Sequence, residues 1–125
     1  MIFKNALVVD DDPVQVEIVR NVLQMIDITN VSVAKDGLEA IQILAAEDQP
    51  FDLIISDMQM PNIDGLELLE SLRQHKKHSD TVFVLMTWDN TLKAPIKAKE
   101  KGATIFLKKP FDPQRLKDSL AMLTS

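Results

Sequence analysis

The chain has 125 residues, 46% of them apolar and 26% charged, which suits one globular domain with a buried core. It contains no cysteine, which excludes disulfide bonds and thiolate metal sites. The net charge of −5 argues against direct nucleic-acid binding, which usually leaves a basic surface. No apolar run approaches the roughly 20 residues of a membrane span, and polar residues interrupt the N-terminal region where a signal peptide would be apolar. We therefore expect one cytoplasmic domain, residues 1–125, that binds neither nucleic acid nor a membrane directly.

Short apolar runs typical of strands alternate with segments of helical period. Strands are predicted at 6–9, 31–34, 51–57, 81–87 and 104–108. Helices are predicted to begin at Pro13, after Asp36-Gly37, after Gly65, near Leu92 and at Pro113. Asp12 and Asp112 each precede a proline, the arrangement of a helix cap followed by a first-turn proline.

The sequence predicts the buried face of the second helix and the bounds of the fourth helix in more detail. In the second helix, the periodicity predicts four side chains facing inward: Leu38, Ile41, Leu44 and Ala45. The fourth helix contains Pro95, which is tolerated only in a first turn. We therefore expect that helix to start late and to run from about Ala94 to Lys101, before Gly102.

The predicted strands are continuous apolar runs rather than alternating ones, a pattern typical of strands buried on both faces of a parallel sheet. Five such strands with intervening helices predict a doubly wound α/β fold. In these folds ligands bind beyond the carboxyl ends of the strands. Asp10 and Asp11 follow the first strand, Asp57 ends the third, Thr87 ends the fourth and Lys109 follows the fifth. These five side chains are therefore expected to share one pocket.

Three carboxylates in one pocket need a compensating cation. Two like unit charges about 4 Å apart repel by about 4 kcal/mol at an effective dielectric constant near 20. Oxygen ligands suit Mg²⁺ better than softer metals. A carboxylate beside such an ion can attack phosphorus, with Lys109 and Thr87 placed to stabilise the phosphoryl oxygens. The pattern indicates phosphoryl transfer to an aspartate assisted by Mg²⁺.

The motifs that carry a family resemblance are Val8-Val9-Asp10-Asp11-Asp12-Pro13, Asp57-Met58-Gln59-Met60-Pro61 followed by Asp64-Gly65, Thr87, and Lys109-Pro110-Phe111. In this order and spacing they resemble the receiver domains of two-component signalling, of which the chemotaxis-type single-domain response regulators are one kind. The resemblance covers essentially the whole chain. It implies a flavodoxin-like five-stranded parallel sheet of order 2-1-3-4-5.

The resemblance also implies roles for the pocket residues. Asp57 would be the phosphoacceptor, and Asp11 and Asp57 would bind Mg²⁺ directly. The backbone carbonyl of Gln59 would be a third protein ligand, and Asp10 would act through a metal-bound water. Thr87 would hold the phosphoryl group.

Further roles are implied for the other motif positions. Lys109 would hold the phosphoryl group with the strand-end threonine, and a cis peptide bond would precede Pro110. Phe106 occupies the position of the aromatic switch residue, which moves together with Thr87. That movement would change the surface formed by the fourth helix, the fifth strand and the fifth helix.

Partners follow from the same resemblance. The phosphodonor would be a sensor histidine kinase or a histidine phosphotransfer protein, which would dock on the first helix around Val14 and Ile18 and on the loop after Lys109. The chain ends after one domain, so we expect a freestanding switch that regulates another protein, whose identity the sequence does not give. It would not be an enzyme acting on outside substrates, although it would assist its own phosphorylation and dephosphorylation.

Trp88 departs from the family pattern, which usually has a small residue directly after the strand-end threonine. Its indole either overhangs the pocket as a lid, slowing reaction with small phosphodonors and water, or turns outward to join a partner surface. The lid leaves open a second function, a pseudo-receiver that binds proteins without being phosphorylated.

Two other possibilities are less favoured. A haloacid-dehalogenase-type phosphatase needs a second acid two places after its nucleophile, where this chain has Gln59. His75 and His78 could bind a metal or transfer phosphate, but their polar surroundings favour a solvated helix end with cations near its negative dipole pole.

Overall fold

The structure is a computed structural model that describes residues 3–124. Its strands form one parallel five-stranded sheet, as the sequence pattern predicts, and their order β2-β1-β3-β4-β5 is the one that the family resemblance implies. The strands are β1 (Ala6–Val9), β2 (Val31–Ala34), β3 (Leu53–Asp57), β4 (Val82–Thr87) and β5 (Ile105–Lys108). Each runs to its predicted last residue. β3 starts two residues later than predicted, after Phe51 and Asp52, and β4 and β5 each start one residue later than predicted.

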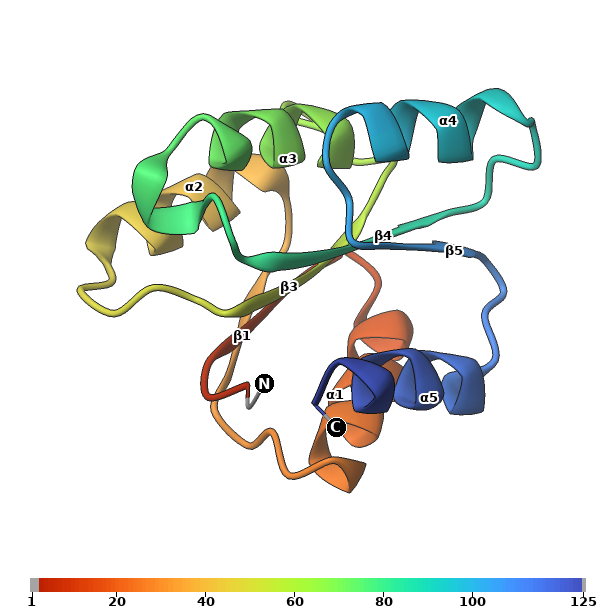
Figure 1. The fold of residues 1–125 in the computed structure, drawn as a ribbon, viewed down its shortest axis with the longest axis horizontal. Coiled ribbons are helices and arrows are strands. Elements are labelled where there is room, and N and C mark those ends of the chain that lie inside the picture. The colour runs from red at the N-terminus through yellow and green to blue at the C-terminus, as the bar shows by residue number, and fades with distance from the viewer. Residues whose placement is uncertain (1–2, 125) are drawn as a thin grey trace.

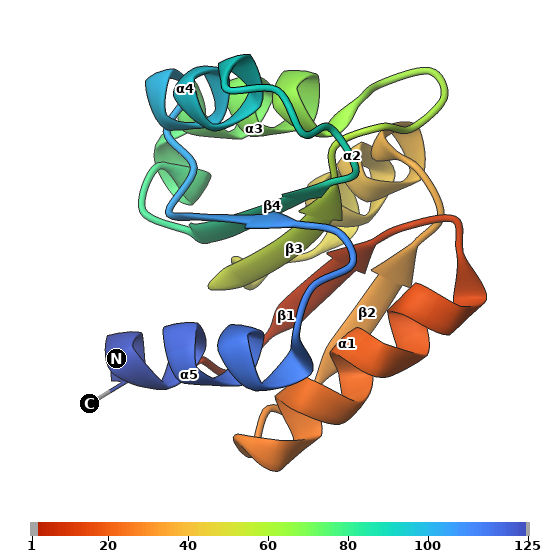
Figure 2. The ribbon, with the colours of Figure 1, turned by 90° about the vertical axis from the view of Figure 1, so that its right-hand side faces the viewer.

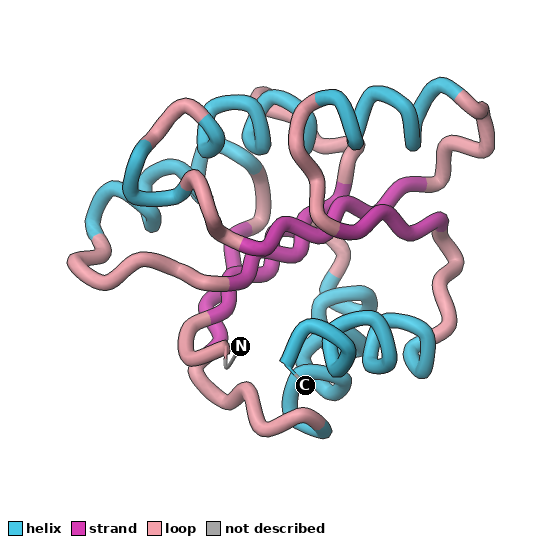
Figure 3. The backbone as a smooth tube through the Cα atoms, viewed as in Figure 1, coloured by secondary structure: helices cyan, strands magenta, loops and turns pink. Residues whose placement is uncertain are grey.

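Helices cover both faces of the sheet (Figures 1 and 2). They are α1 (Pro13–Met25), α2 (Gly37–Ala46), α3 (Gly65–Arg73), the 3₁₀ turn η1 (Lys76–His78), α4 (Lys93–Glu100) and α5 (Pro113–Thr124). Figure 3 shows α2, α3 and α4 on one side of the strands and α1 with α5 on the other. This is the three-layer doubly wound α/β arrangement. Within residues 3–124, no helix is long and apolar enough to span a membrane.

The sheet carries a separate apolar core on each face. Successive side chains of a strand point to opposite faces, so each central strand contributes to both cores. In β1, Ala6 and Val8 belong to the core under α1 and α5, whereas Leu7 and Val9 belong to the core under α2, α3 and α4. Burial on both faces explains why these strands read as uninterrupted apolar runs.

Acidic residues cap the starts of α1, α2, α3 and α5, whereas α4 begins after Leu92 without a side-chain cap. The Asp12 carboxylate accepts a hydrogen bond from the Val14 amide at 3.0 Å, and Pro13 occupies the first helical position, as predicted. Asp112 similarly accepts from the Gln114 amide at 2.9 Å. At α3, Asp64 and Glu67 form a reciprocal capping box, which fixes the start of that helix next to the end of β3.

The predicted inward face of α2 is partly wrong. Leu38 is 46% exposed and Ala45 is exposed, whereas Ala40 and Leu44 are buried against the sheet. The helix rests on the sheet through positions four residues apart, which lie on one face. Ala45 instead lines a groove between α2 and α3, beside Ile41.

Helix α4 accommodates its proline as predicted. It starts at Lys93, so Pro95 lies in the first turn, where a backbone N–H has no intrahelical acceptor to lose. The observed start is one residue before the predicted Ala94, and the end at Glu100 is one residue before the predicted Lys101. Gly102 follows with a positive φ of 96°, which glycine adopts without strain.

Gly65 lets the backbone of α3 approach the end of β3 closely. A Cβ atom at this position would lie 2.4 Å from the Asp57 carbonyl oxygen and 2.8 Å from Leu85 Cδ1. Contacts this short require the backbone to move. The glycine therefore keeps α3 in contact with the strand end that carries Asp57.

We predict that Gly65→Ala destabilises the domain by about 1–3 kcal/mol, because the added methyl group overpacks against backbone. Urea unfolding measures this, with Ser71→Ala on the exposed face of the same helix as the control, expected within about 0.5 kcal/mol of the parent. Equal stability of the parent and Gly65→Ala would contradict the assigned close approach.

Candidate functional site

The chemically active residues predicted from the sequence gather at the carboxyl edge of the sheet. Asp10 directly follows β1, Asp57 is the last residue of β3, Thr87 is the last of β4, and Lys109 directly follows β5. The loops after these four strands lie along one side of the molecule (Figure 2). The parallel direction of the strands brings residues almost one hundred positions apart into one site.

Three carboxylates form the acidic part of this site. One oxygen from each of Asp10, Asp11 and Asp57 lies within 4.8 Å of the other two. Asp10 and Asp57 are 3% and 6% exposed, whereas Asp11 is exposed. Hard oxygen donors, an excess of negative charge and one side open to water are what Mg²⁺ requires. The donor set therefore fits this ion.

Lys109 is the cation within the cluster. Its buried ammonium lies 3.1 Å from Asp10 Oδ2 and 3.4 Å from Asp57 Oδ2. Its backbone is held as well, since its N–H donates to the Thr87 carbonyl at 2.6 Å. The peptide bond to Pro110 is cis, as predicted. One ammonium faces three carboxylates, so the cluster retains net negative charge.

The environment raises the pKa of Asp57 above its ordinary value. Burial is the largest cause, because it penalises the ionised carboxylate. The Lys109 ammonium opposes this shift, and the Asp10 carboxylate adds to it. A cation placed among these acids would favour the ionised, nucleophilic form of Asp57.

Thr87 is buried at the end of β4 and carries two hydrogen bonds on its hydroxyl oxygen. Gln59 Nε2 donates to Thr87 Oγ1 at 2.6 Å, and the Asp89 amide donates to it at 3.0 Å. As a predicted metal ligand, Gln59 would act through its backbone carbonyl, and its position is also one that tunes the lifetime of the phosphoryl group in the family that the motifs resemble. Its side-chain contact with Thr87 joins residues 28 positions apart, so no local pattern could indicate it.

Trp88 lies at the border of the site. Its ring centroid is 5.9 Å from Lys109 Nζ, within the range of a cation–π contact, although 56% of the residue is exposed. The indole therefore lies against the ammonium on one side and meets solvent on the other.

Phe106, the predicted switch aromatic, is half-buried on β5 and packs against the core under α2, α3 and α4.

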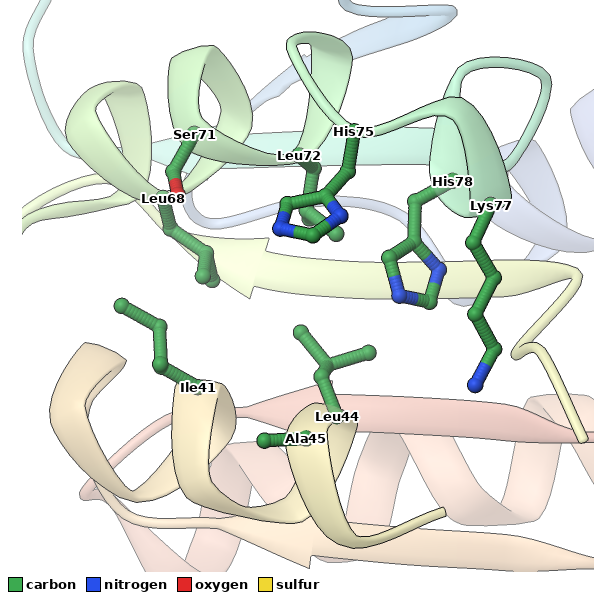
Figure 4. Close-up of a pocket in the computed structure, with 9 residues that line it drawn as sticks. All are labelled: Ile41, Leu44, Ala45, Leu68, Ser71, Leu72, His75, Lys77 and His78. Carbon is green, nitrogen blue, oxygen red and sulfur yellow. The ribbon is translucent and has the colours of Figure 1, made fainter. Parts of the chain in front are cut away.

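The two histidines lie apart from the acidic cluster, in a groove of about 380 Å³ between α2 and the α3–η1 segment (Figure 4). The expectation of a solvated helix end is wrong for His78, which is 6% exposed and whose Nδ1 has no hydrogen-bond partner among residues 3–124. Burial and the neighbouring Lys77 and His75 lower the pKa of His78. His78 lines this groove together with apolar residues of α2 and α3 such as Leu44 and Leu72, a juxtaposition that the local sequence around His78 does not indicate.

Comparisons with known proteins agree with this geometry. The family described as "Response regulator receiver domain" matches residues 6–121. The chain is 33% identical over 114 residues to the chemotaxis protein CheY homolog of Campylobacter jejuni, covering 91% of this chain and 87% of that protein. It is 46% identical over 87 residues to the probable transcriptional regulator ycf29 of Porphyra purpurea, covering 70% of this chain but only 41% of that protein. Chemotaxis response regulator CheY4 of Vibrio cholerae has a similar structure, with a TM-score of 0.85, 30% identity and coverage of 98% and 99%.

We predict that Asp57→Asn makes the Mg²⁺-free protein more stable at neutral pH. The raised pKa means that Asp57 contributes stability below its ordinary pKa near 3.8, and that this contribution is lost as the pH rises through the raised value. The amide removes the charge that burial penalises. Chemical unfolding from pH 3 to pH 8 measures the difference between variant and parent, which should grow with pH. A difference that is constant over this range would contradict the assigned shift.

Proposed function

Because the chain belongs to the response regulator receiver family, we propose that it is a signalling switch that accepts a phosphoryl group on Asp57. The observation that carries this proposal is the shared ion pair of Lys109 with Asp10 and Asp57 at the carboxyl edge of the sheet. It places one fixed positive charge next to the nucleophile, where phosphoryl transfer requires it.

In the proposed reaction, an oxygen of the Asp57 carboxylate attacks the phosphorus of a phosphohistidine. The P–N bond breaks as the new P–O bond forms, and the histidine leaves with a proton. Lys109 exchanges one carboxylate contact for contacts with phosphoryl oxygens, and the Thr87 hydroxyl donates to another of them. Hydrolysis of the aspartyl phosphate later resets the switch.

Asp10, Asp11, Asp57 and the Gln59 carbonyl are the proposed protein contacts of Mg²⁺, with Asp10 acting through water. When bound, this ion would offset the charge of the acids and of the transferred phosphoryl oxygens. The chain's own residues supply the nucleophile, the ammonium and the hydroxyl. On this proposal the protein modifies itself and has no separate substrate to convert.

The proposed output is a change on the surface of α4, β5 and α5. Thr87 and Phe106 lie on neighbouring strands, where Leu85 pairs in register with Phe106 and Thr87 with Lys108. A shift at the end of β4 would therefore be passed to β5 through the sheet. Large apolar side chains are already exposed beside this surface, at Leu92 and Ile96 on the loop and first turns of α4.

The proposed phosphodonor is a sensor histidine kinase or a histidine phosphotransfer protein, and the proposed target is another protein. Val14 is 65% exposed at the start of α1 and lies next to the acidic site in the chain. Ile18, one turn further along, is half-buried. These side chains and the loop after Lys109 form the proposed docking surface for the donor.

The second candidate function is a pseudo-receiver that binds proteins without being phosphorylated. The observation in its favour is the indole of Trp88 beside the Lys109 ammonium. A ring that stays there would restrict the approach of a phosphodonor. The presence of the nucleophile, the ammonium and all three carboxylates favours the phosphorylated switch.

We predict that incubation with Mg²⁺ and acetyl phosphate adds the mass of one phosphoryl group to the parent. Asp57→Asn should gain none, and omission of Mg²⁺ should abolish the addition. Intact-protein mass spectrometry measures this. Addition to Asp57→Asn, or equal addition without Mg²⁺, would contradict the proposed site.

We predict that Trp88→Ala speeds both acetyl phosphate labelling and the subsequent loss of the phosphoryl group, because the ring restricts access beside Lys109. Leu92→Ala, which truncates an exposed apolar residue on the following loop, is the matched control and should change neither rate. Unchanged rates in Trp88→Ala would reject the lid. Labelling absent from both the parent and Trp88→Ala would favour the pseudo-receiver.

A further inference from the structure

The hydroxyl of Thr87 is held from two directions. An alcohol has one hydrogen to donate and two lone pairs to accept, and both lone pairs of Thr87 are occupied in this structure. The Asp89 donor belongs to the same β4–α4 loop and can move together with Thr87. The Gln59 donor comes from the β3–α3 loop and ties the end of β4 to a different segment.

The backbone beneath Gln59 is fixed independently of Thr87. The Met58 amide donates to the Met86 carbonyl at 2.7 Å, and the Gly65 amide donates to the Met58 carbonyl at 3.0 Å. The first bond fastens the β3–α3 loop to β4 one residue before the strand end, and the second fastens it to the start of α3. A movement of the Thr87 side chain relative to Met86 therefore changes its separation from Gln59.

At 2.6 Å, the Gln59–Thr87 bond is slightly shorter than the roughly 2.7–3.2 Å usual for an N–H···O hydrogen bond. A displacement of the hydroxyl can only lengthen it, unless the Gln59 amide follows. A phosphoryl oxygen offers no hydrogen, so Thr87 must turn its own hydrogen toward it. The hydrogen bond from the Gln59 side-chain amide opposes this reorientation of the Thr87 hydroxyl.

We propose that the Gln59 side chain is a positioning residue that holds Thr87 in the unphosphorylated arrangement and so sets the resting bias of the switch. This inference rests on the proposed function, because it concerns the same threonine. It assigns the side chain a role separate from that of the Gln59 backbone carbonyl. Removal of the amide donor favours the phosphorylated arrangement without adding any contact to the phosphoryl group.

The test uses beryllofluoride, a tetrahedral mimic of a phosphoryl group on a carboxylate, at saturating Mg²⁺. Trp88 is the only tryptophan in the chain and follows Thr87 directly, so its fluorescence reports on binding. Gln59→Met keeps the length of the side chain but removes the donor, and Gln59→Asn keeps the amide but shortens its reach. Both variants should bind the mimic about two- to tenfold more tightly, the range expected from the loss of one hydrogen bond.

Gln42→Met is the matched control, since it makes the same chemical change at an exposed position on α2. Its half-saturating concentration of beryllofluoride should equal that of the parent. If the parent binds the mimic but Gln59→Met binds it equally or more weakly, the positioning role is overturned and the proposed function stands. If the parent does not bind beryllofluoride, the proposed function is contradicted, and the positioning role of Gln59 is contradicted with it.

A second readout needs neither Mg²⁺ nor the mimic. Urea unfolding of the parent, Gln59→Met, Thr87→Val and the double variant gives the coupling between the two side chains. Gln59→Met should destabilise the parent but have much less effect in the Thr87→Val background. Equal effects in both backgrounds would overturn the inference, because a side chain that stabilises its loop by other contacts would show no dependence on the Thr87 hydroxyl.

Discussion

The buried ammonium of Lys109 between Asp10 and Asp57 is the interaction on which the site depends. Two carboxylates that are almost fully buried would repel each other and lose hydration without a nearby positive charge. The ammonium offsets part of this cost and leaves the cluster with net negative charge. Burial and the neighbouring Asp10 nevertheless disfavour ionisation of Asp57, and the remaining negative charge makes the site receptive to a further cation.

The fold supplies the rigid frame that this crowded charge requires. β1 and β3 are buried on both faces, and each packs into two apolar cores. Asp10 and Asp57 lie at or directly after the ends of these two strands, and Thr87 and Lys109 lie at or directly after the ends of β4 and β5. The register of the sheet therefore sets the positions of these residues. Gly65 adds to this rigidity by bringing α3 into contact with Asp57, the proposed phosphoacceptor.

Around this fixed centre, the contacts of the neighbouring side chains involve less buried groups. Gln59 and Trp88 are both exposed, and they reach Thr87 and Lys109 through one hydrogen bond and one ring contact. Such contacts stabilise a conformation modestly and are readily exchanged. A rigid charge cluster bordered by exchangeable contacts suits the proposed switch, in which the site of phosphorylation would stay in place while the neighbouring loop moved.

Sequence alone determined the five βα units, the parallel sheet and the residues at the strand ends. A strand that is buried on both faces must be an apolar run, so the polar residues that follow the run mark the end of the strand. It also placed the Asp12 cap and the short α4 around Pro95, since these are local effects. Only the tertiary structure decided that Leu38 is exposed and His78 buried, because both depend on how α2 and α3 pack. It alone revealed the Gln59–Thr87 bond and the Trp88–Lys109 contact, which join distant segments through side-chain geometry that no periodicity records.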